Sequence, residues 1–560
     1  MVKNQIKSLT EKIVLSLYGN SHGREDDAIE VLVDVPKEKI HGDYSTNVAL
    51  VLAKKLNKSP VEVAKEIVSK VSDNRLFEKV EMASPGFINF YLSKDFFIEG
   101  FKKIDKIFGR NNNLKNKKII IEYTDPNILK EFHIGHLMSN TIGESISRII
   151  DFHGAKVKRL CYQGDVGLHV AKAIWGKMKN SSNAWQEAYV FGSEKYESDE
   201  FAKKEMVVLN KKIFEKSDRE VNKLYEEGRK WSLANFDKVY KKLGTKFDCL
   251  FFESETALFG KKIVEDGLKK GIFEKGDNGA IIFKGEKYGL HTRVFINSEG
   301  LPTYEAKELG LAKVKYDKYR YDNSVIVTAN EQNEYFKVVL SAMSQIFPAL
   351  AEKTKQISHG MMRLPEGKMS SRTGKVVTFE FLLNEVEKLV KEKMTNRDFS
   401  EKEKEEITEK VTIGALKYSI LKQSIGSDII YDFEKSISFE GDSGPYLQYS
   451  YVRALSVLEK AKLEKIKPSF KNVSDQIGSL ERLLNRFPEV VEEAGEKYEP
   501  HLIATYLIEL AREFNNYYTK NKIVDKNDEF SQYKVALTQA FSIIMKNGLW
   551  LLGIPAPEKM

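Results

Sequence analysis

A strand, a helix and a second strand follow one another directly between residues 117 and 165, and this order constrains the fold more than any other feature of the sequence. The segment "KKIIIEYTD" is an apolar run of the kind that forms a buried strand. The segment "HLMSNTIGESISRIIDFHG" places Met138, Ile142 and Ile149 on one face of a helix, and "KVKRLCYQGD" is the next predicted strand. Such a βαβ unit predicts a parallel sheet with right-handed crossovers, to which "NSVIVTANEQ" and "KQISHGMMRL" add later strands.

Three regions of the chain have different patterns. Residues 1–110 combine helical stretches such as "SPVEVAKEIVSKV" with the extended segment "VEMASPGFINFYL", which predicts an α+β domain. Residues 115–395 contain the predicted α/β sheet domain, with a charged helical insertion at about 176–246. In residues 398–560 the strand pattern is lost and apolar residues recur at intervals of four and three, which predicts an all-α bundle. The clearest stripe consists of Ile503, Leu507, Leu510, Phe514 and Tyr517.

The composition is that of an ordinary globular protein, with 42% hydrophobic and 30% charged residues among 560. The most apolar stretch, "VALTQAFSIIMKNGLWLLGIP", is interrupted by Gln539, Lys546 and Asn547, so a bundle helix is expected there and no membrane span. Cys161 and Cys249 are too few for a disulfide framework or a four-thiolate zinc site. The start of the chain lacks the apolar centre of a signal peptide, and we expect a cytoplasmic protein. A net charge of +8 suits a polyanionic partner without requiring one.

The tetrapeptide "HIGH", His133 to His136, lies where the first strand of the sheet gives way to its helix. Free backbone N–H groups and the helix dipole favour phosphate at a helix start, and ligands of open parallel sheets bind beyond the carboxyl ends of the strands. The alternative is a pair of histidines that only cap the helix. A zinc site would need further Cys or acidic ligands nearby, and the sequence shows no familiar set.

A second motif, "EGKMSSRTGK", follows the predicted strand "KQISHGMMRL". Lys368, Arg372 and Lys375 could donate to phosphate oxygens, whereas taken alone the segment reads as a solvated basic loop. The sheet could bring this loop to "HIGH".

Together these segments resemble a known family. "HIGH" and "KMSS" resemble the paired signatures of class I aminoacyl-tRNA synthetases, and further segments resemble the arginyl-tRNA synthetases in the order that this family has. These segments are "GFINF", "DPNILKEFHIGHL", "YQGDVGLHVAK", "GLPTYEAKELG", "EGKMSSRTG", "GPYLQYSYVRA" and "GLWLLGIPAPEKM".

The resemblance implies three domains and a reaction. Residues 1–110 would bind the tRNA elbow, a Rossmann-type (HUP-like) catalytic domain would occupy 115–395, and an anticodon-binding bundle would occupy 398–560. Arginine would attack the α-phosphate of ATP, and the arginyl group would pass to the terminal adenosine of tRNA(Arg). Mg²⁺ is expected to accompany ATP without a dedicated protein site, and a monomer is expected.

The resemblance also implies roles for individual residues. Donors beside the phosphates would stabilise developing negative charge, and carboxylates would accept the guanidinium of arginine. The implied catalytic residues are Lys130, His133, His136, Lys368 and Ser370, and ATP would also contact Gly135, Met362 and Met369. Arginine would be bound by Asn89, Asn127, Glu253, Tyr304, Glu308 and Gln332. The implied tRNA-binding residues are Tyr446, Gln448, Tyr449, Arg453 and Met560, although packing in the bundle explains its aromatic residues equally well.

The chain departs from the family pattern at three places. Glu308 stands where the family usually has aspartate, and Val166 replaces a usual tryptophan. Ser371 occupies the place of the second lysine of the loop signature, so one cation is missing there. In family members with this loss, a lysine before "HIGH" is thought to replace it, and Lys130 has the matching position.

Two competing hypotheses remain at this point. A synthetase for another amino acid is one: a cysteine enzyme should show a zinc-binding Cys/His set, and a glutamate enzyme should present cations to its substrate's side chain. The other is a synthetase-like RNA-binding protein that has lost catalysis, against which the intact "HIGH", Lys130 and Lys368 argue.

Overall fold

The computed structural model describes residues 2–19, 30–71, 74–180, 184–365, 377–395, 397–474 and 476–560. The chain forms two compact units. The smaller combines residues 1–110, 450–493 and 506–547, and the larger combines residues 111–449, 494–505 and 548–560. Each unit joins stretches from more than one of the expected domains, so the boundaries 1–110, 115–395 and 398–560 stay a prediction.

A five-stranded parallel sheet is the centre of the larger unit, with the strand order β12-β11-β5-β6-β7. This confirms the parallel α/β fold that the sequence predicts. On one face, Ile120 and Leu160 of the sheet pack with Leu311 and Tyr321. Near the carboxyl ends of the strands, the Ser139 hydroxyl accepts from the N–H of Thr124 and donates to the Val327 carbonyl. The strands are β5 (Lys118–Glu122), β6 (Lys156–Gln163), β7 (Cys249–Phe252), β11 (Asn323–Ala329) and β12 (Thr354–His359).

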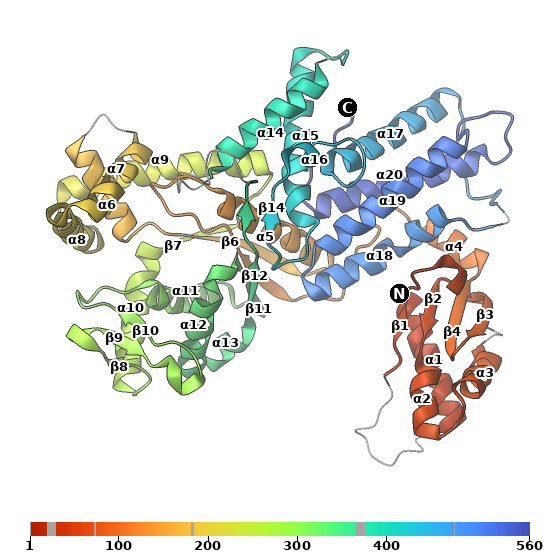
Figure 1. Cartoon of the computed structure of the whole chain (residues 1–560), viewed down its shortest axis with the longest axis horizontal. Coiled ribbons are helices and arrows are strands. Elements are labelled where there is room, and N and C mark those ends of the chain that lie inside the picture. The colour runs from red at the N-terminus through yellow and green to blue at the C-terminus, as the bar shows by residue number, and fades with distance from the viewer. Residues whose placement is uncertain are drawn as a thin grey trace. The chain divides into compact units, whose positions relative to one another are not determined.

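Helices connect these strands, as Figure 1 shows. The insertion between β6 and β7 is helical as predicted, and its helices, drawn in yellow, group together in the figure. The connecting and insertion helices are α5 (Ile134–Phe152), α6 (Leu168–Lys179), α7 (Trp185–Ser198), α8 (Glu200–Glu215), α9 (Arg219–Leu243), α10 (Glu253–Lys269), α11 (Tyr304–Tyr319), α12 (Asn333–Ile346) and α13 (Pro348–Lys353), with short 3₁₀ turns η3 (Asp277–Gly279), η4 (Gly285–Tyr288) and η5 (Asn330–Gln332).

Two small sheets of this unit are absent from the sequence expectations. Strands β8 (Glu274–Lys275), β9 (Ile281–Phe283) and β10 (Arg293–Ile296) form an antiparallel sheet, which is too short for a clear period-two pattern. Strand β14 (Ile429–Ile430) pairs with β13 (Met362–Arg363), so the expectation of a strand-free region after Asp398 was wrong at this point. The pairing forms because Ile429 is buried against the end of the sheet domain.

The remaining helices of the C-terminal region confirm the predicted helical bundle. Ile503, Leu507, Leu510 and Phe514 are fully buried in α19, and the ring of Phe514 stacks on Phe541 at 3.9 Å between centroids. No helix in the described part of the chain is both long and apolar enough to span a membrane. The helices are α14 (Phe379–Met394), α15 (Glu401–Leu421), α16 (Phe433–Ser436), α17 (Gly444–Leu463), α18 (Ser479–Lys497), α19 (His501–Lys520) and α20 (Ser531–Leu551).

The N-terminal residues form the predicted α+β structure around a four-stranded sheet with the order β1-β2-β4-β3. The extended segment "VEMASPGFINFYL" is a hairpin, since Pro85 and Gly86 turn the chain between β3 and β4. The elements are α1 (Val2–Tyr18), β1 (Val33–Asp34), η2 (Lys39–His41), β2 (Tyr44–Thr46), α2 (Val48–Leu56), α3 (Pro60–Val71), β3 (Phe77–Ala83), β4 (Phe87–Leu92) and α4 (Lys94–Phe101).

Candidate active site

Two histidines cap the first turn of α5 reciprocally. His133 is the N-cap, and its Nδ1 accepts from the N–H of Gly135 at 3.1 Å. The Nδ1 of His136 accepts from the N–H of His133 at 3.2 Å. This is the geometry of a capping box, with imidazole rings in place of the usual serine and glutamate. The two histidines therefore do cap the helix, which was one of the two alternatives that the sequence left open. The Nε2 atom of each ring takes no part in the cap.

The caps determine which ring nitrogen carries the proton. An Nδ1 atom that accepts a hydrogen bond has no proton, so each neutral ring is protonated on Nε2. Burial and then the charge of Lys130 lower the pKa of His133 to about 4. Burial, His133 and Lys130 also hold the pKa of His136 well below its ordinary value. At neutral pH both rings are thus uncharged Nε2–H donors at the start of a helix.

The charge of Lys130 also acts on a third histidine. Burial and then Lys130 lower the pKa of His169 to about 3, while the Nε2 of His169 lies 3.1 Å from the carbonyl of Gly164. The Nζ of Lys130 is 5.2 Å from the ring centroid of Tyr189. The charge of this one lysine therefore helps to lower the pKa of three imidazoles, all of which are neutral at neutral pH.

Helix α9 supports the segment that carries Lys130. Leu129 has a left-handed backbone with a φ of 63°, and its N–H donates to the Ser232 hydroxyl at 2.9 Å. The ring of Phe132 lies 6.4 Å from that of Phe236 and 6.2 Å from that of Tyr240. Because Ser232, Phe236 and Tyr240 lie on α9, the position of this helix sets the course of the chain around Lys130.

Gly164 brings two of the predicted arginine-binding residues together. The chain after β5 pairs with it, as the N–H of Ile128 donates to its carbonyl at 3.0 Å. A Cβ atom at position 164 would lie 2.1 Å from Oδ1 of Asn127 and 3.5 Å from Oε1 of Glu253. The other carboxylate oxygen of Glu253 accepts from Lys307 at 2.6 Å. Burial raises the pKa of Glu253 although Lys307 acts in the opposite direction.

Glu308 lies in a cluster of carboxylates that contains too few cations. Glu122 and Lys315 form an ion pair of 2.9 Å, and each side chain is 2% exposed. Burial and then Glu122 raise the pKa of Glu308, and the same two causes raise the pKa of Asp125. No ion pair or hydrogen bond joins Glu308 to another residue in the part of the chain that the structure describes. A planar cation such as a guanidinium would complete this cluster.

Comparisons with known proteins match the chain from end to end. A model of "tRNA synthetases class I (R), catalytic domain" matches residues 103–433, an "Arginyl tRNA synthetase N terminal domain" matches 1–92, and a "DALR anticodon binding domain" matches 447–560. A relative from Halothermothrix orenii, named arginine–tRNA ligase, is 31% identical over 98% of this chain and 99% of its own length.

The chain belongs to the arginyl-tRNA synthetase family. It is thereby a class I aminoacyl-tRNA synthetase. Two solved arginyl-tRNA synthetases share the fold over 100% of this chain. The Thermus thermophilus structure has a TM-score of 0.75 at 23% identity and is itself covered to 100%. The Plasmodium falciparum structure has a TM-score of 0.80 at 21% identity and is covered to 99%.

The other residues that the family resemblance implies for binding arginine and ATP lie in different parts of the fold. Tyr304, at the start of α11, has its ring centroid 4.7 Å from Nζ of Lys307, and Gln332 is exposed just before α12. Met362 is buried in β13. Asn89 lies in the smaller unit and lines a cavity of about 400 Å³. Lys368, Met369 and Ser370 lie outside the described residues.

The residues that the family pattern implies for tRNA binding are divided between the two units. Gln448 is fully buried and donates to the carbonyls of Lys410 and Pro555, and Met560 is also buried, which supports packing roles for both. Tyr446 and Tyr449 are half-buried on α17 of the larger unit. Arg453 belongs to the smaller unit, where it donates to Asn515 and lies 5.1 Å from the Tyr518 ring centroid.

The sequence analysis did not identify several residues whose hydrogen bonds connect the elements of the candidate active site. The fully buried Asp165 accepts from the Tyr225 hydroxyl at 2.8 Å and from the hydroxyl and N–H of Ser254 at 2.7 and 2.8 Å. It thereby ties the loop after β6 to α9 and α10. Asp165 and His169 both lie in "YQGDVGLHVAK", so the family motif contained the signal. Val166, where the family usually has tryptophan, is buried, and its carbonyl accepts from Lys307 at 3.4 Å.

Proposed function

We propose that this site activates arginine with ATP and transfers the arginyl group to the 3′-terminal adenosine of tRNA(Arg). The observation that carries the proposal is that neutral imidazole donors follow β5, while Glu308, which interacts electrostatically with Glu122 and Asp125 at the end of the same strand, makes no ion pair within the described residues. The imidazoles suit the phosphates of ATP, and carboxylates suit the guanidinium and α-amino group of arginine. The names of the relatives support the same activity.

In the first step a carboxylate oxygen of arginine attacks the α-phosphorus of ATP. A bond forms between that oxygen and phosphorus, and the bond to the bridging oxygen breaks, so that pyrophosphate leaves with the electron pair. The Nε2–H groups of His133 and His136 donate to the phosphate oxygens as their negative charge grows. Lys130 supplies the fixed positive charge beside them. Lys368 and Ser370 are proposed to bind the pyrophosphate, as the family pattern implies.

In the second step the 2′-hydroxyl of the terminal adenosine attacks the arginyl carbonyl. A bond forms between the hydroxyl oxygen and the carbonyl carbon, the bond from that carbon to the phosphate oxygen breaks, and AMP leaves with the electron pair while one of its phosphate oxygens takes the proton of the hydroxyl. Since the pKa of His133 is lowered to about 4, this ring is neutral throughout the physiological range and acts as a donor without a positive charge of its own.

Selection of arginine is divided between two carboxylates. Lys307 already holds Oε2 of Glu253, and Oε1 faces Gly164 near Asn127. We therefore assign Glu253 and Asn127 to the α-amino end of the substrate. The nearby cation Lys315 is ion-paired with Glu122, so Glu308 is assigned to the guanidinium, with Tyr304 on the same helix. Gln332 and Asn89 complete the proposed set.

The partners and setting are also proposals. Mg²⁺ is expected to arrive with the ATP phosphates, since it is usually held by substrate phosphates and water together with few protein ligands. Tyr446, Gln448, Tyr449, Arg453 and Met560 stay candidates for tRNA contact. We further propose a cytoplasmic monomer with an elbow-binding domain at 1–110, a catalytic domain at 115–395 and an anticodon-binding domain at 398–560.

ATP–pyrophosphate exchange across the amino acids, with and without tRNA, tests this function. Among the amino acids, only arginine is expected to support exchange, and only when tRNA is present. Exchange of equal strength without tRNA would refute the tRNA requirement. Normal tRNA binding without any arginyl-tRNA formation would instead identify an RNA-binding protein that has lost catalysis.

A further inference from the structure

Two helices, α9 and α20, end in the same way, and both ends lie in the larger unit. Gly244 follows α9 with a φ of 64°, and Gly553 follows α20 with a φ of 65°. The N–H of Thr245 donates back to Tyr240, and the N–H of Ile554 donates back to Leu549. Such glycine caps still leave carbonyl oxygens at the negative end of each helix dipole.

Arg148 of α5 binds carbonyls from both helix ends. Its Nη1 donates to Trp550 at 2.9 Å and its Nη2 donates to Gly244 at 3.0 Å. The guanidinium also lies 5.3 Å from the ring centroid of Trp550. A planar guanidinium can donate in two directions at once, which a lysine ammonium at the end of a flexible stem cannot reproduce.

Lys417 of α15 repeats this arrangement. Its fully buried Nζ donates to the carbonyl of Leu243 at 2.6 Å and to that of Gly553 at 2.9 Å. The Ser145 hydroxyl of α5 donates to the Leu551 carbonyl at 2.9 Å. Five carbonyls from two helix ends are thus bound by three side chains from α5 and α15.

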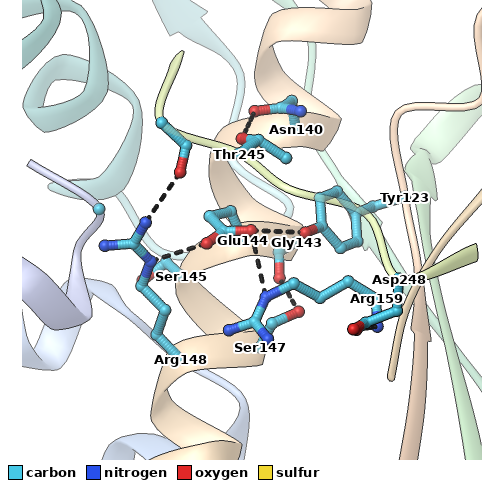
Figure 2. Close-up of polar contacts among 12 residues, drawn as sticks. Tyr123, Asn140, Gly143, Glu144, Ser145, Ser147, Arg148, Arg159, Thr245 and Asp248 are labelled. Atoms are coloured by element: carbon cyan, nitrogen blue, oxygen red, sulfur yellow. Dashed lines mark hydrogen bonds and ion pairs between the residues drawn. The ribbon is translucent and has the colours of Figure 1, made fainter. Parts of the chain in front are cut away.

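Glu144 fixes the orientation of Arg148, as Figure 2 shows. Its Oε1 accepts from Nε of Arg148 at 2.7 Å. Its Oε2 accepts from the Tyr123 hydroxyl at 2.6 Å and lies 3.4 Å from Nε of Arg159. The carboxylate is 3% exposed, so the guanidinium is held by a buried anion at one edge and uses its other edge for the carbonyls.

The same face of α5 is bonded to the chain near the active site. Asn140 accepts from the Thr245 hydroxyl at 2.8 Å (Figure 2). Its amide donates to the Thr124 hydroxyl at 3.0 Å. Asn140, Glu144 and Arg148 are spaced by four residues, which places them on one stripe of the helix. This stripe lies on α5, the helix that His133 caps. It joins the end of α9 to the segment that directly follows β5.

We infer that Arg148 is a positioning residue for arginine activation: it fixes the ends of α9 and α20 on α5 and thereby sets the position of Leu129–His133. Helix α9 transmits this effect because Ser232 receives the N–H of Leu129 and Phe236 and Tyr240 pack on Phe132. The inference rests on the proposed role of Lys130 and His133 in the first step.

The test compares Arg148→Lys with Arg159→Lys in the full-length enzyme. Both keep a cation near Glu144, but Arg148→Lys alone loses the paired bonds to Trp550 and Gly244. The single-turnover rate of arginyl-adenylate formation is measured at saturating arginine, ATP and tRNA. We expect Arg148→Lys to slow this step by about tenfold or more, because small displacements near reacting groups are costly. The KM for arginine should change by less than about threefold, and Arg159→Lys should stay within about twofold of the wild-type rate.

A second variant separates positioning from folding. Arg148→Ala should be slow in the same way at a temperature at which this variant is still fully folded, and guanidinium ion added there should restore part of its rate. An unchanged rate in Arg148→Lys overturns the inference, as does an equal loss in Arg159→Lys or a rate that follows only the folded fraction. Lys130→Ala in the same assay distinguishes the two proposals. If Lys130→Ala is slow and Arg148→Lys is not, only the positioning role fails; if neither is slow, the proposed first step fails.

Discussion

His133 and His136 stack with their ring centroids 3.6 Å apart, and each ring accepts a backbone N–H of the same helix turn through Nδ1. The backbone thus decides the tautomer of both rings. It leaves two Nε2–H donors that need no proton from solvent and no neighbouring carboxylate to orient them. A helix start that binds phosphate through N–H groups gains two more N–H groups in this way.

Titration of the histidines should show this arrangement directly. In the unfolded chain a histidine titrates near its ordinary value, whereas the pKa of His133 is lowered to about 4 in the fold. The unfolded state therefore binds more protons between these values, and the fold loses up to about 3 kcal/mol as pH falls through this window. NMR of the His133 Cε1–H should report a neutral ring at pH 6. Lys130→Met should move its pKa upward, and a midpoint near 6.5 in the wild type would contradict the stacked, capped arrangement.

Replacement of Lys130 tests the cation that the loop signature lacks. Lys130→Ala should slow adenylate formation by at least about tenfold, or about 1.4 kcal/mol of transition-state stabilisation. Lys238→Ala is the matched control, since Lys238 lies on α9 and lines the same cavity of about 340 Å³ as Lys130. It should leave the single-turnover rate unchanged. Equal rates for wild type and Lys130→Ala would remove Lys130 from the mechanism.

Glu308→Gln should separate stability from substrate binding. The pKa of Glu308 is raised by burial and by Glu122, so ionisation of this carboxyl costs stability as pH rises above its ordinary value. The amide removes that cost, and we expect a higher melting temperature at pH 7. The same change should raise the KM for arginine by about tenfold or more, because a guanidinium loses a charged acceptor.

Glu305→Gln on the same helix provides the control for Glu308. Glu305 accepts from Arg293 at 3.0 Å, so its replacement should lower the melting temperature and leave the KM for arginine nearly unchanged. If Glu308→Gln melts lower than wild type and binds arginine normally, Glu308 has a structural role and the assignment to the guanidinium is wrong.

Lys417 should make the stability of the larger unit depend on pH in the alkaline range. Burial and then Arg148 lower its pKa to about 7, and Glu144 opposes them. Between this value and the ordinary lysine value the unfolded chain binds more protons, so stability rises with pH by up to about 5 kcal/mol. A neutral amine keeps two N–H groups for the carbonyls of Leu243 and Gly553.

The measurement is the difference in melting temperature between wild type and Lys417→Met from pH 6.5 to 9.5. This difference cancels the groups that both proteins share and should grow in favour of the wild type as pH rises. Lys402→Met, at an exposed position of the same helix, should show a constant difference. A constant difference for Lys417→Met as well would mean that Lys417 titrates normally.

The sequence predicted what depends on local pattern. The strand "KKIIIEYTD" and the helix after it are confirmed because an apolar β-branched run and a helical stripe each specify their own structure. The reciprocal caps follow from the spacing of His133 and His136, although the sequence offered capping and phosphate binding as alternatives. The structure shows that the first is present and leaves the rings available for the second.

The rest depends on contacts between distant segments. Glu122 and Lys315 are 193 positions apart, and Leu243 and Gly553 each meet Lys417 from different parts of the chain. The spacing of apolar residues along the sequence does not predict contacts between such distant residues. Asn140, Glu144 and Arg148 look like an ordinary solvated stripe of a helix, yet Asn140 and Glu144 are buried because two other helices end against them.

The shared ends of α9 and α20 also limit how this chain can be recombined with others. A chimaera that exchanges residues 398–560 would transfer Lys417 and Gly553 together but leave Glu144 and Arg148 behind. If a foreign helix ends one turn earlier or later than α20, its terminal carbonyls would lie too far from Arg148 and Lys417 to accept their hydrogen bonds. Grafts of this region should therefore succeed only when the length of the last helix and the α5 stripe are exchanged as one module.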